Sequence, residues 1–280
     1  MPLLSVEELE RMAPIFKGRA GNAFAKGMMH LLSIDRVNEL YDRNTAVNGP
    51  DFAAAVLDDI GMRYHIGCAS ADPSESLSSV IPDGPFITVS NHPCGHVDGI
   101  SLVDVFGHMR PDYKVMVNKI LSMIKPLENC FIQVTPTGTE RTAPTSASVS
   151  GIKAALRHLR SGGSLGLFPS GAVSDLSIKD RCVRDREWQE AVIKLIMKAQ
   201  VPVIPVRFFD GNSAFYYSLG LIDWRIRLLR LPAEVFNKRG KIMHIGIGQV
   251  ISVEEQKRFG NDVRAFGDYL RKSVYDMERQ

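Results

Sequence analysis

From residue 86 onward, short apolar runs alternate with longer amphipathic segments. Strands are predicted at 86–90, 114–117, 130–134, 164–168, 203–209 and 241–247, and helices at 99–107, 119–124, 146–159, 187–199 and 261–277. Gly, Pro or polar clusters bound most of the runs, which are rich in β-branched residues. This order predicts an α/β fold with a largely parallel or mixed central sheet and helices on both faces. Between 209 and 241 we expect a helical region broken by Gly220 and Pro232.

Residues 1–80 read as a helical N-terminal region, and 81–280 as the second domain. Ser5-Val-Glu-Glu8 is a capping-box pattern, and helices at 35–41 and 51–60 follow, the second ended by Gly61. A possible edge strand lies at 63–66. The apolar segment 20–32 carries basic residues in and before it, and two interpretations remain open: a helix on a membrane surface, or one packed on the main domain.

Composition narrows the class of protein. The chain has 280 residues, 45% hydrophobic and 23% charged, as in ordinary globular proteins, and a net charge of +3 argues against a dedicated nucleic-acid binder. We see no signal peptide and no apolar run of roughly 20 residues. The four cysteines are far apart, so no zinc site, other metal site or disulfide framework is predicted. The sequence favours a cytoplasmic protein, soluble or peripheral on a membrane.

One stretch, 86–102, gathers most of the reactive side chains. A strand leads into a helix through a loop that holds His92, Cys94, His96 and Asp98, and loops of this kind often carry the chemistry of α/β proteins. Histidine can remove a proton near neutral pH, and a carboxylate on its second nitrogen fixes the tautomer. The alternative is that Asp98 only caps the following helix.

The same loop offers two other chemistries. Cys94 lies two residues from His92 and from His96, which suggests a thiol-dependent hydrolase, but side chains two residues apart rarely face each other. His96 is a second candidate base. Ser170 does not lie in a Gly-x-Ser-x-Gly turn, so a serine hydrolase is disfavoured.

Three ordered blocks resemble one superfamily. Asn91-His-Pro-x-Gly-x-x-Asp98-Gly, the segment 167–174 (Leu-Phe-Pro-Ser-Gly-Ala-Val-Ser) and the segment 203–213 (Val-Ile-Pro-Val-Arg-Phe-Phe-Asp-Gly-Asn-Ser) resemble the motifs of the glycerolphosphate/lysophospholipid acyltransferases. Five residues separate the histidine from the aspartate, where four are usual. That spacing resembles the hemolysin-like branch, which includes lyso-ornithine-lipid and glycine-lipid O-acyltransferases.

The resemblance implies direct acyl transfer on a glycerolphosphate acyltransferase-like fold. His92, oriented by Asp98, would take the proton of a lyso-lipid hydroxyl, which attacks an acyl thioester. Acyl-acyl carrier protein or acyl-CoA would be the donor, with no metal, cofactor or covalent acyl-enzyme. Such an enzyme would be peripheral on the inner face of the cell membrane.

Departures from the usual pattern bear on the acceptor. Ser170 replaces the glutamate, and Ala172-Val173 the threonine and arginine, of the block associated with phosphate acceptors. We therefore expect an N-acyl amino acid acceptor rather than a phosphomonoester. The predicted substrate-binding residues are Asn91, Lys119, Ser170, Gly171, Arg207 and Asn212. Further candidate cations for a carboxylate are Lys179, Arg181 and Arg184; Gly171 also suits a tight turn, and Asn212-Ser213 a helix cap.

Three alternatives to this function remain open: a 1-acylglycerol-3-phosphate-type acyltransferase, a non-catalytic lipid-binding or hemolysin-like protein, and the Cys94 hydrolase. The stretch 224–231 mixes arginine with bulky apolar residues. It predicts either a basic amphipathic membrane surface or a helix packed on the sheet with its arginines reaching water.

Overall fold

The computed structural model describes residues 3–12, 14–68, 77–134 and 146–280. Within these residues the centre is a seven-stranded sheet in the order β1-β9-β8-β2-β5-β3-β4. Its strands are β1 (Arg63–Cys68), β2 (Ile87–Ser90), β3 (Lys114–Asn118), β4 (Phe131–Val134), β5 (Leu165–Leu167), β8 (Val203–Phe208) and β9 (Ile242–Ile247). Every neighbouring pair is parallel except β8 with β9, so the predicted largely parallel or mixed sheet is confirmed.

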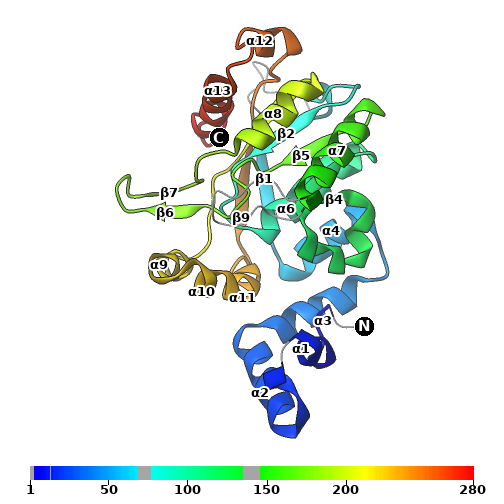
Figure 1. The fold of residues 1–280 in the computed structure, drawn as a ribbon, viewed down its shortest axis with the longest axis vertical. Helices are drawn as coiled ribbons and strands as arrows, with labels where there is room; N and C mark the ends of the chain where they lie inside the picture. The colour runs from blue at the N-terminus through cyan, green and yellow to red at the C-terminus, as the bar shows by residue number, and fades with distance from the viewer. Residues whose placement is uncertain (1–2, 13, 69–76, 135–145) are drawn as a thin grey trace.

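Helices cover both faces of the sheet (Figure 1). One face carries α4 (Gly49–Ile60), α6 (His96–Met109) and η3 (Lys125–Cys130), and the other α7 (Ser146–Arg160), α8 (Glu190–Ala199) and α13 (Val263–Tyr275). Successive strand residues point to opposite faces. Val203 packs in the α8–α13 core and Ile204 in the α4–α6 core, which gives the central strands their unbroken apolar sequences.

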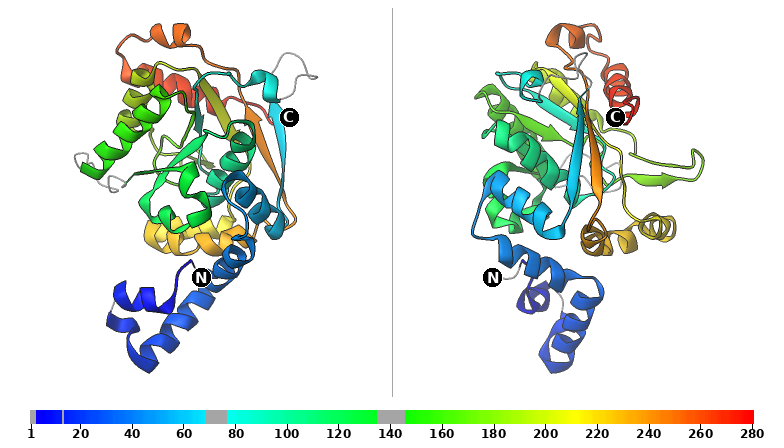
Figure 2. Two further views of the ribbon diagram at one scale, coloured as in Figure 1. Left: turned by 90° about the vertical axis from the view of Figure 1, so that its right-hand side faces the viewer. Right: turned by 180° about the vertical axis from the view of Figure 1, so that it is seen from behind.

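The first helices project from one end of the molecule (Figure 2). They are α1 (Val6–Met12), η1 (Pro14–Phe16), α2 (Gly18–Leu31) and α3 (Ile34–Asn44). The capping box is present: Ser5 Oγ accepts from the Glu8 backbone N–H at 3.2 Å, and Glu8 Oε2 from that of Ser5 at 2.8 Å. α3 meets the main body where Arg36 stacks over the Phe236 ring. β1 is an edge strand, as predicted, and extends to Cys68.

Several elements differ from the predicted ones. The polar loop after β5 contains a two-stranded antiparallel hairpin, β6 (Asp175–Ser177) and β7 (Cys182–Arg184), whose strands are too short to show alternation. The region 210–240 forms α9 (Ala214–Ile222), α10 (Trp224–Leu229) and α11 (Leu231–Phe236). Gly220 lies inside α9, so the predicted break there is wrong; the chain turns at Asp223, which caps α10. Pro232 stands in the first turn of α11.

Two short helices, α5 (Leu77–Val80) and α12 (Val253–Lys257), were not predicted. Most of the predicted loop 135–146 lies outside the described residues. None of the helices that the structure describes has the length and apolarity to cross a bilayer.

Gly166, in the middle of β5, is the basis of a stability prediction. A Cβ there would lie 2.3 Å from the hydroxyl of buried Tyr113, which shares a 2.6 Å hydrogen bond with Thr88. We expect Gly166→Ala to lower the free energy of unfolding by about 1–3 kcal/mol, because the close-packed side chains must shift. Denaturant titration measures this, and Gly84→Ala, where a Cβ meets open space, is the control. Equal stability of the two variants would contradict the packing described.

Candidate active site

The site lies where β2 ends, at the carboxyl edge of the parallel strands. Asn91 follows β2 and its side-chain amide pairs with both backbone groups of Phe208: Nδ2 donates to the carbonyl, and Oδ1 accepts from the N–H, each at 2.8 Å. The side chain thus continues the β2–β8 ladder where the main chain turns away. Both amide atoms of this predicted substrate-binding residue are therefore engaged in the protein.

The carboxylate of Asp98 organises the loop that follows. It is fully buried in the first turn of α6, and its Oδ2 accepts from His92 Nδ1 at 3.0 Å and from the backbone N–H groups of Cys94 at 2.8 Å and Gly95 at 3.0 Å. Gly95 has φ = 73°, which glycine adopts without strain. The structure thus combines the two functions considered for Asp98: it faces His92 and also binds the amides that lead into α6.

The contact fixes which nitrogen of His92 is free. A carboxylate accepts hydrogen bonds, so Nδ1 carries the hydrogen and Nε2 keeps its lone pair. The imidazole side chain is 18% exposed, and its ring stacks on Phe168, with centroids 3.9 Å apart and an interplanar angle of 28°. Within the described residues Nε2 has no hydrogen-bond partner, and an imidazole oriented in this way can accept a proton from a bound hydroxyl.

A second buried carboxylate, Asp185, holds the main chain of His92. Its Oδ1 accepts from the His92 backbone N–H at 3.1 Å and from Ser174 Oγ at 2.5 Å, and its Oδ2 from Trp188 Nε1 at 3.1 Å. The Ser174 N–H donates to the His92 carbonyl at 2.9 Å. Asp185 and Ser174 therefore fix the two backbone groups of His92, one each.

Burial raises the pKa of Asp185, and the hydrogen bonds from Ser174, His92 and Trp188 oppose that rise. Our sequence reasoning missed this residue. Asp185 follows β7, in a segment predicted as a polar loop. The only sequence signal that pointed to Asp185 was its partner Ser174, the serine that ends the second motif block and donates its hydroxyl to the carboxylate.

A cavity of about 470 Å³ adjoins the histidine loop. Its wall includes Asn91 and Pro93, the residues on either side of His92, together with Arg207, Asn212 and Tyr217. The Tyr217 hydroxyl donates to the Pro93 carbonyl at 2.8 Å, which ties the cavity wall to the loop. Three of the predicted substrate-binding residues, Asn91, Arg207 and Asn212, thus line one cavity.

Two polar side chains of that cavity, Arg207 and Asn212, differ in what they bind; Asp210 adds a carboxylate to the same wall. Arg207 Nη1 donates to the carbonyls of Tyr275 and, at 2.6 Å, Met277. The guanidinium lies 4.7 Å from the Phe209 ring centroid, and burial lowers its pKa. Both side-chain amide atoms of Asn212 are buried and have no partner among the described residues. An amide without partners is costly to bury; a ligand amide would supply partners for both atoms, and a ligand carboxylate would accept from Nδ2.

The turn that follows β5 is held in place by hydrogen bonds and close packing. Ser170 Oγ donates to the Ala172 carbonyl at 2.8 Å. Gly171 has φ = +67°, and a Cβ there would lie 2.1 Å from Gln189 Nε2, so the tight turn predicted for Gly171 is confirmed. Ser213 caps α9 by accepting from the Tyr216 N–H at 3.1 Å.

The remaining candidate cations lie on the surface. Lys119 is exposed at the start of η2 (Lys119–Met123) and, within the described residues, does not line the cavity. Lys179 and Arg181 are exposed in the turn of the β6–β7 hairpin, and Arg184 pairs with Asp180 at 3.3 Å. Among the described residues no group of His, Cys, Asp or Glu is arranged to hold a metal ion.

The geometry disfavours Cys94 and His96 as reacting groups. Cys94 is 2% exposed, its Sγ lies 3.5 Å from the Asp210 carbonyl, and burial raises the pKa of the thiol far above neutrality. Thiolate is the nucleophilic form, so burial and the raised pKa make this thiol a poor nucleophile. Burial, and to a smaller extent the neighbouring His92, lowers the pKa of His96 to about 4, and the Asp98 carboxylate faces His92.

Comparison with known proteins finds one matching family model and several similar chains. A family model described as "Acyltransferase" matches residues 54–280. A lyso-glycine lipid O-acyltransferase of Bacteroides thetaiotaomicron is 24% identical, covering 87% of this chain and 85% of its own. One of Phocaeicola vulgatus is 24% identical, covering 80% and 77%. The crystal structure of a 1-acyl-sn-glycerophosphate acyltransferase from Thermotoga maritima aligns with a TM-score of 0.45 and 13% identity, over 80% of each chain.

Burial of the cysteines leads to a labelling prediction. Under native conditions iodoacetamide should modify Cys182, the exposed cysteine, and leave Cys94 and Cys130 unmodified until the chain is denatured, because both are buried and burial raises their pKa values. Peptide mass spectrometry before and after denaturation measures the difference. Rapid native labelling of Cys94 would contradict the burial described for this thiol and would favour the hydrolase interpretation.

Proposed function

The chain belongs to the acyltransferase family whose model covers its residues 54–280, and we propose that it moves a fatty acyl group from a thioester to the hydroxyl of a lyso-lipid. It is thus an acyltransferase, as the three sequence blocks predicted. The observation that carries the mechanism is the 3.0 Å contact between His92 Nδ1 and Asp98 Oδ2, which leaves Nε2 free. His92 is the proposed general base.

In the proposed reaction Nε2 of His92 takes the proton of the acceptor hydroxyl as its oxygen attacks the thioester carbonyl carbon. The buried carboxylate of Asp98 stabilises the imidazolium that forms. When the carbon–sulfur bond breaks, the thiolate leaves with the electron pair, and the imidazolium returns a proton to it. No group on the protein is acylated, in agreement with the burial and raised pKa of Cys94.

We propose a lyso-aminolipid, an N-acyl amino acid with a free hydroxyl, as the acceptor. Two relatives of similar length are named lyso-glycine lipid O-acyltransferases. Ser170, where phosphate-acceptor members carry glutamate, uses its hydroxyl on the Ala172 carbonyl. The cavity beside His92 offers groups that suit the amide and carboxylate of such a lipid: the unpartnered amide of Asn212 and the guanidinium of Arg207.

For the other predicted substrate-binding residues we propose no direct contact with the substrate, except for Lys119. Asn91 would hold the end of β2 against β8, and Gly171 would allow the tight turn after β5. Ser170 would stabilise that turn through its hydrogen bond to the Ala172 carbonyl. A part for Lys119 in substrate binding stays a prediction. The donor also stays open between acyl-acyl carrier protein and acyl-CoA, since both present the acyl chain as a thioester. A peripheral position on the inner face of the cell membrane is the location we propose.

Replacing the base should abolish most of the transfer. With a labelled acyl thioester and lyso-glycine lipid, we expect His92→Gln to lower the rate by about 10²–10⁴-fold, because general-base assistance is lost. Asp98→Asn should also lower it, since the amide cannot stabilise the imidazolium. The control is His65→Gln, at an exposed position of β1. Thin-layer chromatography of the product measures transfer, and unchanged rates for both site variants would refute the mechanism.

The same assay with lysophosphatidic acid as acceptor distinguishes the phosphate alternative, which faster transfer to that acceptor would favour. Wild-type chain that transfers to none of the lyso-lipids would argue for a binding protein without catalysis.

Asp185→Asn tests the support of His92. Asparagine can still accept hydrogen bonds from the His92 N–H and from Ser174. Its NH₂ group, however, would face Trp188 Nε1, so two donors would oppose each other and this hydrogen bond would be lost. We expect kcat to fall about ten- to hundredfold with KM little changed, because a small displacement of the base costs rate more than binding. Asp180→Asn, in the exposed hairpin turn, is the matched control. A change in KM alone would show that Asp185 does not position the base.

A further inference from the structure

Exposed apolar side chains concentrate on α9 and α10. Of thirteen large hydrophobic residues that are exposed in the described chain, six lie on these two helices: Phe215, Leu221, Ile222, Ile226, Leu228 and Leu229. The most exposed is Ile222, at 77%. Scattered apolar residues are ordinary on a protein surface, but a contiguous group marks a contact site.

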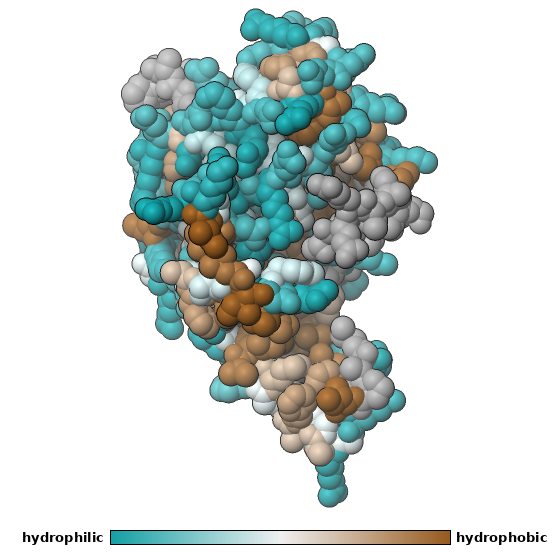
Figure 3. Space-filling view, turned by 60° about the vertical axis from the view of Figure 1, so that its left-hand side comes forward, coloured by the Kyte–Doolittle hydropathy of each residue, from teal (hydrophilic) through white to brown (hydrophobic). Residues whose placement is uncertain are grey.

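The tip of the β6–β7 hairpin adds to this face. Ile178, in the turn between the strands, is 71% exposed, while Leu176 of β6 packs with Tyr216 and Tyr217 of α9. The hairpin therefore rests on α9 through its strands, and its tip projects from the main body on the same side as α9 (Figure 1). Figure 3 shows apolar side chains gathered over the hairpin and the helices below it. We call Ile178 and the six helix residues the apolar face.

Basic side chains flank the apolar face. Lys179 and Arg181 lie exposed beside Ile178, and Arg225 lies on α10, its guanidinium 5.2 Å from the Trp224 ring. None of the three cations forms an ion pair within the described part of the chain. Exposed apolar residues with arginine, lysine and tryptophan at their edge are the composition that binds the boundary of an anionic bilayer.

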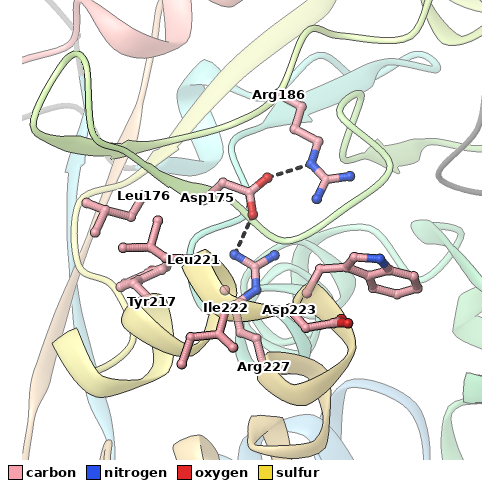
Figure 4. Close-up of a pocket in the computed structure, with 10 residues that line it drawn as sticks. Asp175, Leu176, Arg186, Tyr217, Leu221, Ile222, Asp223 and Arg227 are labelled. Atoms are coloured by element: carbon pink, nitrogen blue, oxygen red, sulfur yellow. Dashed lines mark hydrogen bonds and ion pairs between the residues drawn. The ribbon is translucent and has the colours of Figure 1, made fainter.

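A second cavity, of about 390 Å³, lies under this face (Figure 4). Leu221 and Ile222 belong both to the apolar face and to the cavity wall. Leu176 and Tyr217 line this cavity and also the larger one beside His92. The two cavities thus share part of their walls, and a path of neighbouring side chains leads from the surface toward the proposed acceptor site.

Ion pairs of Asp175 link the apolar face to the site. Asp175 of β6 pairs with Arg186 and with Arg227 of α10, each at 2.5 Å (Figure 4). Arg227 is buried and donates to the carbonyl of Ser174 at 3.0 Å, and the N–H of Ser174 holds the His92 carbonyl. The hairpin and α10 are therefore fixed relative to the histidine.

We infer that the apolar face is the surface by which this chain docks on an anionic lipid bilayer. The inference rests on the proposed function, because a lyso-lipid acceptor resides in the bilayer, and it names the surface through which that acceptor reaches the site. The apolar residues enter the boundary of the acyl chains, and Lys179, Arg181 and Arg225 meet the headgroups.

Vesicle binding tests the inference without any substrate. The full chain is sedimented with phosphatidylcholine vesicles, with and without phosphatidylglycerol. We expect binding to require phosphatidylglycerol and to weaken with salt. The double variant Ile226→Ser with Leu229→Ser, at exposed positions outside both cavities, should weaken it about tenfold or more, given the apolar area removed.

Two controls make the result specific. Ile242→Ser replaces a similarly exposed residue on β9 and should bind as wild type. Phe24→Ser with Leu31→Ser tests the exposed apolar residues of α2. If the α2 variant loses binding and the α10 variant keeps it, or if wild type binds no vesicles, the inference is overturned. Thermal unfolding checks that each variant is folded, and acyl transfer to an acceptor below its micellar concentration tests the proposed function separately.

Discussion

The site depends on one buried carboxylate oxygen that accepts three N–H groups. Oδ2 of Asp98 binds the imidazole of His92 and the backbone amides of Cys94 and Gly95, and it does so in the first turn of α6, where the helix dipole favours negative charge. Burying a carboxylate is costly unless its hydrogen bonds are made. The three bonds to Oδ2 offset part of this cost, shape the loop and orient the base, while Oδ1 is buried without a partner among the described residues.

Much of this could be predicted from the sequence because it is local. His92 and Asp98 lie within one loop, and the strands of the sheet are continuous apolar runs because helices cover both faces. Asp185 escaped prediction because its partner His92 is 93 residues away and the hairpin before it has strands of three residues. Periodicity cannot reveal such short strands, and one sequence does not reveal a distant pairing.

Residue type also says little about how many of a group's hydrogen bonds are already in use. Arg207 was predicted as a substrate-binding residue, and its Nη1 already binds the carbonyls of Tyr275 and Met277. Asn91 was predicted to bind substrate, and its amide pairs with the backbone of Phe208. Asn212, by contrast, has an amide without described partners. Only the folded structure distinguishes a polar group that serves the protein from one that is available to a ligand.

The hairpin that contains β6 and β7 has a practical consequence for spectroscopy. Cys182 is an exposed thiol in β7, in the strand that leads to Asp185. The other cysteines that the structure describes are buried or partly buried, so a fluorophore or spin label can be attached at this position without mutating the chain. A reporter there would sit between the surface that carries Ile178 and the carboxylate that holds the backbone of His92, and would register changes at either end.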